Sequence, residues 1–187
     1  MDLTTGLNIG LGLVAAVATV IATYLAWRQY RRPNPSEIIA VGEKVTIYLT
    51  RASTVAAFAA MLDSAPTDGI VFGQCKSCKD YPETFYQSIL RASARGVHFQ
   101  FIANPGTEGR EFSERIRAIE TMEIRFKYVE GARTLGIKDR EALTVISGPV
   151  GYIGLHLRDA VAAKQQYRSF ESEWDASEPY DRREYAQ

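Results

Sequence analysis

The chain has few of the residues that build disulfide frameworks and metal sites. Its 187 residues include only two cysteines, Cys75 and Cys78, and two histidines, His98 and His156. Two cysteines in a domain of this size do not make a disulfide scaffold, which agrees with a reducing compartment. Because the histidines lie far from the cysteines in the sequence, the spacing of a zinc site is lacking. We therefore expect no metal and no other cofactor.

The chain also lacks an excess of charge of either sign. It has 22 basic and 22 acidic residues, and the part from Ser36 onward has 19 basic and 21 acidic residues. Nucleic-acid-binding domains use positive charge to neutralise phosphates. A slightly acidic domain is a poor match for phosphates, so the charge balance predicts no binding to nucleic acid.

Charge is entirely absent from residues 3–27, near the N-terminus. The 21 residues of the apolar segment 7–27 would form a helix of roughly 31 Å, enough to cross a hydrocarbon core of about 30 Å. Arg28, Arg31 and Arg32 follow at once, while Asp2 precedes the segment. Because positive charge collects on the cytoplasmic side, we expect a single-pass anchor in the plasma membrane with the C-terminal domain in the cytoplasm.

A cleaved signal peptide and a buried core helix are the alternatives for this segment. A signal peptide has positive charge before its apolar run and a small-residue cleavage site after it, and neither is present here. The sequence then divides into an anchor with a basic flank (1–32), a linker (33–41), one domain (42–175) and a polar tail (176–187). Gly6 and Gly10 form a GxxxG pattern, which is typical of helix pairs in membranes and favours a homodimer.

Apolar periodicity in the domain alternates between strands and helices. A strand-helix alternation with crossovers of 10–15 residues predicts an α/β class, with a mostly parallel mixed sheet and helices on both faces. The expected strands cover 44–49, 70–73, 97–103, 123–129, 142–146 and 152–155, and the expected helices cover 54–63, 82–94, 110–121 and 158–174.

One interpretation of this pattern is a thioredoxin-like fold. Cys75 and Cys78 form a CxxC motif between an expected strand and an expected helix, where a redox pair would lie. Against this, no proline precedes the strand 142–146, and no aromatic residue stands immediately before Cys75. A thiol oxidoreductase using these two cysteines therefore stays an alternative.

Two passages of the domain follow the pattern of a known family. The passage 88–102, SILRASARGVHFQFI, leads from a helix through Arg-Gly-Val into a strand, and the segment 142–154, ALTVISGPVGYIG, is an expected strand-turn-strand. With these passages the chain resembles the phospholipase D superfamily over residues 42–175. In that family a leucine-rich helix precedes Arg-Gly-Val and a strand, and the strand-turn-strand carries the HxK(x)4D motif and the Gly-Ser that follows it. The resemblance implies a phospholipase D-like fold behind the anchor and, since such enzymes build one site from two domains, again a dimer.

The resemblance does not bring the family's catalytic residues with it. Placing Gly154 at the family's glycine puts Arg140 at the histidine nucleophile, Ala142 at the lysine and Ser147 at the aspartate. Leu155 then takes the position of the phosphate-binding serine. Neither His98 nor His156 has a lysine two residues further on. We therefore expect no catalytic residue and a degenerate domain that is not an enzyme.

Basic and polar residues near the lost motif could still form an anion pocket. Lys138, Arg140, Ser147 and His156 are the candidate ligand-binding residues, and the expected ligand is anionic or nucleotide-like. The predicted function is a binding, sensing or partner-recruiting module at the membrane. A membrane-tethered phosphodiesterase with a noncanonical site is a further alternative.

Overall fold

The computed structural model describes residues 38–75, 81–116, 119–129, 133–148 and 151–179. All of them belong to one compact unit, Glu37–Gln187. Within these described ranges, no helix has both the length and the apolar character needed to cross a membrane. The predicted anchor at residues 3–27 lies outside them.

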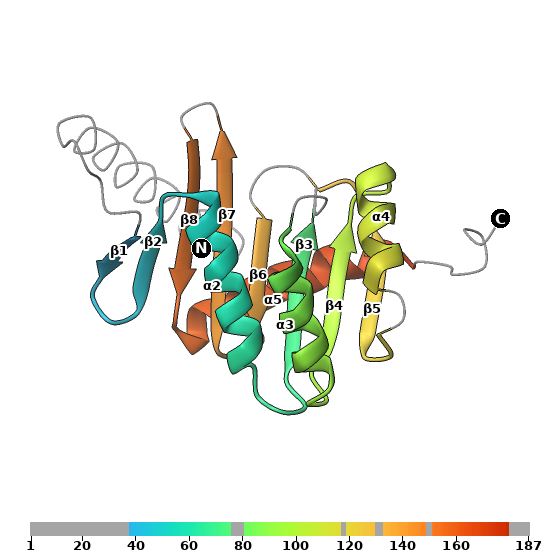
Figure 1. Cartoon of the computed structure of the whole chain (residues 1–187), viewed down its shortest axis with the longest axis horizontal. Coiled ribbons are helices and arrows are strands. Elements are labelled where there is room, and N and C mark those ends of the chain that lie inside the picture. The colour runs from blue at the N-terminus through green and yellow to red at the C-terminus, as the bar shows by residue number, and fades with distance from the viewer. Residues whose placement is uncertain (1–37, 76–80, 117–118, 130–132, 149–150, 180–187) are drawn as a thin grey trace, which may run out of the picture. The chain divides into compact units, whose positions relative to one another are not determined.

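A nine-stranded sheet forms the centre of the domain (Figure 1), in the order β1-β2-β8-β7-β6-β3-β4-β5-β9. The strands are β1 (Ile38–Val41), β2 (Val45–Tyr48), β3 (Ile70–Cys75), β4 (His98–Ala103), β5 (Met122–Phe126), β6 (Arg133–Ile137), β7 (Glu141–Gly148), β8 (Gly151–Leu157) and β9 (Glu178–Pro179).

The sheet is mixed, but the prediction that it is mostly parallel is wrong. Only the pairs β3–β4 and β4–β5 are parallel, and the other six pairs are antiparallel. The physical reason lies in the connections. Helices link the strands from β2 to β5, whereas only two or three residues connect β6 to β7 and β7 to β8, and connections this short can only join antiparallel neighbours.

Helices cover both faces of the sheet, as the sequence predicts. The helices are α2 (Arg51–Ser64), α3 (Glu83–Ser93), α4 (Thr107–Ile116) and α5 (Ala160–Asp175). Helices α2, α3 and α4 lie on one face and α5 crosses the other (Figure 1). A large apolar core fills the first face, and a smaller aromatic core around Phe72, Tyr167, Phe170 and Trp174 lies under α5.

Capping residues set where two of the helices begin. The side chain of Thr50 accepts a hydrogen bond from the backbone N–H of Ser53, so α2 begins at Arg51, three residues before the predicted helix 54–63. Asp159 caps α5 by accepting from the N–H groups of Val161 and Ala162. Gly96 ends the turn after α3 with a φ of 83°, a conformation that favours glycine.

Three strands lie where the sequence predicts none. Strand β6 falls between the predicted strands 123–129 and 142–146, β1 falls in the predicted linker, and β9 falls in the predicted polar tail. Strand β6 pairs antiparallel with β3, where Phe72 lies opposite Gly136. A Cβ atom on Gly136 would come within 2.3 Å of the Phe72 ring, so this close approach requires glycine. Gly131 and Gly136 favour a loop in the sequence, although Gly136 is a packing residue of a strand.

Candidate functional site

The four residues predicted to bind a ligand do not meet in one pocket. Lys138 and Arg140 flank the turn between β6 and β7, whereas Ser147 lies at the other end of β7, opposite Tyr152 in register. Arg140 and Ser147 are seven residue steps apart along extended chain, a distance of roughly 23 Å. The structure therefore separates the positions that the predicted motif would combine.

His156 lies near Arg140, in a buried ion-pair cluster. Its Nε2 atom is 2.8 Å from Oε2 of Glu141, and both side chains are at least nine-tenths buried. Arg140 and Arg158 approach the same carboxylate at 3.6 Å and 4.0 Å. Burial by itself raises the pKa of Glu141, but the hydrogen bond and charge of His156 and the charges of both arginines hold the pKa below its ordinary value. This cluster joins β7 to β8; its His156–Glu141 pair is buried, whereas the side chains of Arg140 and Arg158 are about half exposed.

The remaining candidates have partners or lie elsewhere. The Lys138 ammonium lies 4.4 Å from the centre of the Tyr167 ring, and Arg140 donates a 2.6 Å hydrogen bond to the carbonyl of Ser64. His98 is exposed at the start of β4. Among the described residues, no group of three or more His, Cys, Asp or Glu could hold a metal ion.

Of the CxxC motif, only Cys75 falls within the described residues. It forms the end of β3 and lies opposite Ala103 of β4 in register. Cys78 lies outside the described residues, so the redox alternative stays a prediction.

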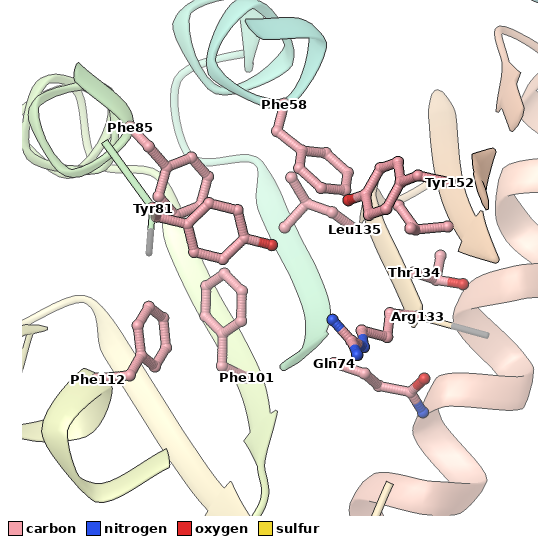
Figure 2. Close-up of a pocket in the computed structure, with 11 residues that line it drawn as sticks. Phe58, Gln74, Tyr81, Phe85, Phe101, Phe112, Arg133, Thr134, Leu135 and Tyr152 are labelled. Atoms are coloured by element: carbon pink, nitrogen blue, oxygen red, sulfur yellow. The ribbon is translucent and has the colours of Figure 1, made fainter. Parts of the chain in front are cut away.

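A pocket that the sequence analysis missed lies at the carboxyl ends of β3 and β4 (Figure 2), and we call it the carboxyl-edge pocket. Ligands of open α/β sheets bind outside the carboxyl ends of parallel strands, so its place in the fold makes this pocket the candidate site. The empty space is about 400 Å³, including that at its open mouth. Its lining combines Gln74, Thr134 and Arg133 with two tyrosines and an apolar wall, namely Tyr81, Tyr152, Phe58, Phe85, Phe101, Phe112, Leu135 and Val145.

Arg133 is the charged residue of this lining, at the start of β6. Its Nε atom is buried and has no hydrogen-bond partner. A buried donor without a partner costs free energy, about 1–3 kcal/mol for a typical group. The side chains of Arg133 and Tyr81 point from opposite sides toward the same space (Figure 2). An acceptor placed in this space would satisfy the unpaired donor.

The two tyrosines of the pocket remain protonated over the physiological range. Burial raises the pKa of Tyr81 to about 12, the nearby Tyr152 adds to the rise, and Arg133 and Arg51 oppose it. Burial also raises the pKa of Tyr152 against the effect of the same two arginines. Neutral phenols next to an arginine offer hydrogen-bond donors, which is the chemistry that an anion needs.

Two features of the sequence explain why this pocket was not predicted. Arg133 follows Gly131 in a segment whose glycines favour a loop, so it was not placed on a strand. Tyr81 follows the CxxC motif, which drew attention to thiol chemistry instead. The useful indication was positional, because residues just after a buried strand of an α/β sheet face the ligand-binding edge.

Comparison with known proteins identifies the fold. No protein family profile matches the sequence, and no curated protein sequence is significantly similar. Among solved structures, Nuc from Salmonella typhimurium, a phospholipase D family member, matches with a TM-score of 0.59 and 10% identity over 73% of this chain and 99% of Nuc. NucT from Helicobacter pylori matches with a TM-score of 0.61 and 10% identity over the same shares. The domain has a phospholipase D-like fold. The fold predicted from the resemblance is thereby confirmed.

A third match among solved structures corrects one prediction. TrmBL2, an archaeal chromatin protein with a novel mode of DNA binding, matches with a TM-score of 0.62 and 12% identity over 95% of this chain and 67% of TrmBL2. The prediction that the chain does not bind nucleic acid is therefore wrong as an exclusion, because the same fold occurs in a DNA-binding protein. The physical reason is that net charge sums over the whole domain, whereas a phosphate responds to the local field.

Proposed function

We propose that the chain is a membrane-anchored phospholipase D-like domain that binds a phosphate-bearing ligand in the carboxyl-edge pocket without hydrolysing it. The observation that carries the proposal is the buried, unpaired Nε of Arg133 beside two protonated tyrosines. An arginine at such a site binds phosphate oxygens through directed hydrogen bonds as well as charge.

The lining supports binding more than catalysis. The donors come from Arg133, the hydroxyls of Tyr81 and Tyr152, and the side chains of Gln74 and Thr134. Among the described residues of the lining there is no carboxylate that would repel an anion. Nor does a histidine line it, so covalent phosphoryl transfer to an imidazole has no starting point there.

A thermal-shift experiment on the full chain in detergent micelles tests the binding. Inorganic phosphate is the probe, and ligand at about 100 times its Kd stabilises a protein by roughly 2.7 kcal/mol. For a domain of this size such a gain raises Tm by about 5–10 °C. Arg133→Ala should abolish the shift, and Arg140→Ala should keep it.

The matched arginines decide between the two possible sites. Arg140 lies in the turn between β6 and β7, at the opposite end of these strands from the carboxyl-edge pocket, and belongs to the ion-pair cluster around Glu141. A shift in Tm that is lost in Arg140→Ala and kept in Arg133→Ala would exclude the carboxyl-edge pocket as the phosphate site and favour the site predicted from the sequence. No shift in the unsubstituted chain, with phosphate or with a nucleoside monophosphate, would overturn anion binding altogether.

The anchor and its orientation form part of the proposal. The uncharged segment 3–27 and the arginines that follow it support a single span in the plasma membrane with the domain in the cytoplasm. A reporter fused after Gln187 should be active only if it is of a type that works in the cytoplasm. Strong activity of a reporter that requires export would contradict this orientation.

DNA binding is a second candidate, favoured by the match to TrmBL2 over nearly the whole chain. A gel-shift assay with duplex DNA separates the two candidates. DNA binding that survives Arg133→Ala would place the nucleic acid elsewhere on the domain. Binding that requires Arg133 would make a DNA phosphate the ligand of the pocket.

A further inference from the structure

The carboxyl-edge pocket has a polar side and an aromatic side. Arg133 lies on the polar side, and its unpaired Nε is buried. The rings of Phe85, Phe101 and Phe112 lie across the pocket, on the side from which Tyr81 projects (Figure 2), and we call these four residues the aromatic side. A small inorganic anion bound to Arg133 would leave the aromatic side in contact with water.

The aromatic side is a set of rings that hold one another in place. Tyr81 stacks on Phe85, with ring centroids 4.4 Å apart and an interplanar angle of 24°. Phe101 and Phe112 meet edge to face, with centroids 5.7 Å apart. Tyr86 lies behind both pairs, because its ring contacts Phe85 and Phe112. Since these side chains are already ordered, a ligand that packs against them gives up little side-chain freedom on binding.

Apolar surface also lies directly beside Arg133. Leu135 follows Arg133 by two residues on β6, so the two side chains lie on the same face of the sheet. Gly73 of β3 pairs in register with Leu135 on one side and with Phe101 on the other. A Cβ on Gly73 would lie 2.7 Å from the Phe101 ring and 3.0 Å from Leu135, so these two side chains meet over the glycine. A ligand held by Arg133 therefore has apolar surface next to its anionic group.

The apolar part of the lining favours a flat ring over an acyl chain. Six aromatic side chains line the pocket, against the aliphatic pair Leu135 and Val145. Aromatic rings that meet in stacked or edge-to-face geometry gain roughly two- to tenfold in affinity beyond the burial of their area. An acyl chain gains only from the area that it buries.

We propose that the ligand of the carboxyl-edge pocket is a small phosphate ester that carries a flat aromatic group. Its phosphate binds on the Arg133 side, and its ring packs against Phe101 and Phe112. The inference rests on the proposed binding of phosphate at Arg133. The empty space of about 400 Å³ falls within the range of roughly 300–1,000 Å³ that is typical of small-molecule pockets. Nucleotides and aryl phosphates are the two sources of this chemistry.

Isothermal titration calorimetry on the full chain in detergent micelles tests the ring. The probes are methyl phosphate, cyclohexyl phosphate and phenyl phosphate, which present the same phosphate group. The last two have the same number of carbon atoms, and only the phenyl ring is flat. The Kd of phenyl phosphate should be roughly three- to tenfold lower than that of cyclohexyl phosphate. A Kd for adenosine monophosphate below that of phenyl phosphate would identify the ring as a nucleobase, and a higher Kd would identify an aryl phosphate.

Replacing one ring of the aromatic side should remove this preference. Phe101→Leu should give equal Kd values for phenyl and cyclohexyl phosphate and keep the Kd of methyl phosphate. Phe112→Leu serves the same purpose if Phe101→Leu fails to fold. The matched control is Phe170→Leu, because Phe170 is 4% exposed, as against 3% for Phe101, but lies in the separate aromatic core under α5. The control should keep the preference for phenyl phosphate.

Three results would overturn the inference and leave the proposed phosphate binding in place. The first is equal Kd values for phenyl and cyclohexyl phosphate in the unsubstituted chain, which would indicate an apolar group of any shape. The second is one Kd for all three probes. The third is a preference for phenyl phosphate that survives both Phe101→Leu and Phe112→Leu. Failure of every probe to bind would overturn the proposed phosphate binding and this inference with it.

Discussion

The Nε2 atom of His156 lies 2.8 Å from Oε2 of Glu141, and this buried pair joins the start of β7 to the end of β8. Arg140 and Arg158 add positive charge around the same carboxylate. The cluster therefore stabilises the ionised form of Glu141 in the folded protein.

The pH dependence of stability follows from this relationship. The pKa of Glu141 is lower in the folded chain than its ordinary value of 4.5, so its contribution is complete above that value and is lost as the pH falls through the folded pKa. Glu141→Gln should lower the unfolding free energy by about 1–3 kcal/mol at neutral pH. Denaturant titrations from neutral pH to below 4 should show the two chains converging in acid. A difference that stays constant with pH would contradict the assigned charge.

Arg133 offers a prediction in which stability and binding change in opposite directions. Its buried Nε has no partner in the ligand-free protein, so Arg133→Met should raise the unfolding free energy by about 1 kcal/mol or leave it unchanged. The same substitution should abolish stabilisation by phosphate. Chemical denaturation with and without phosphate measures both effects. A loss of several kcal/mol without ligand would show that Arg133 supports the fold instead.

Gly136 should not tolerate even a methyl group. A Cβ at this position would lie 2.3 Å from the ring of Phe72, which is fully buried under α5. Gly136→Ala should cost about 1–3 kcal/mol through overpacking. Gly106→Ala is the control, because a Cβ there meets nothing within 4 Å. Equal Tm values for the two variants would show that the Phe72 ring moves aside freely.

Phosphodiester hydrolysis should be absent from the full chain. His98 is exposed at the start of β4 and His156 is held by Glu141, so no histidine among the described residues lies in the carboxyl-edge pocket. Lipid and nucleic-acid substrates should give no turnover above background, and no phosphohistidine should be trapped. Turnover that disappears on replacing either histidine would make the protein an enzyme.

The class of the fold could be predicted from the sequence, because mostly buried apolar strands such as β3 and β4 alternate with helices along the chain. Segments whose residues have conflicting preferences for strand and loop were harder to predict. Gly136 by itself favours a loop. Its role in a strand depends on the Phe72 ring that it accommodates, and that ring comes from a strand more than 60 residues earlier. The site was missed for a related reason. Arg133 and Tyr81 are far apart in the sequence, and only the antiparallel pairing of β6 with β3 brings them to one edge.

The pairing of β3 with β6 has a mechanical consequence. It is the seam between the parallel strands β3, β4 and β5 and the antiparallel strands that begin with β6, and it consists of three residue pairs in register. One wall of the pocket, with Gln74 and Phe101, belongs to the first group, and Arg133 belongs to the second. A ligand held between the walls would act as a clamp across this short seam. Binding of the ligand should slow the amide hydrogen exchange of residues 71–73, 136 and 137, none of which lines the pocket.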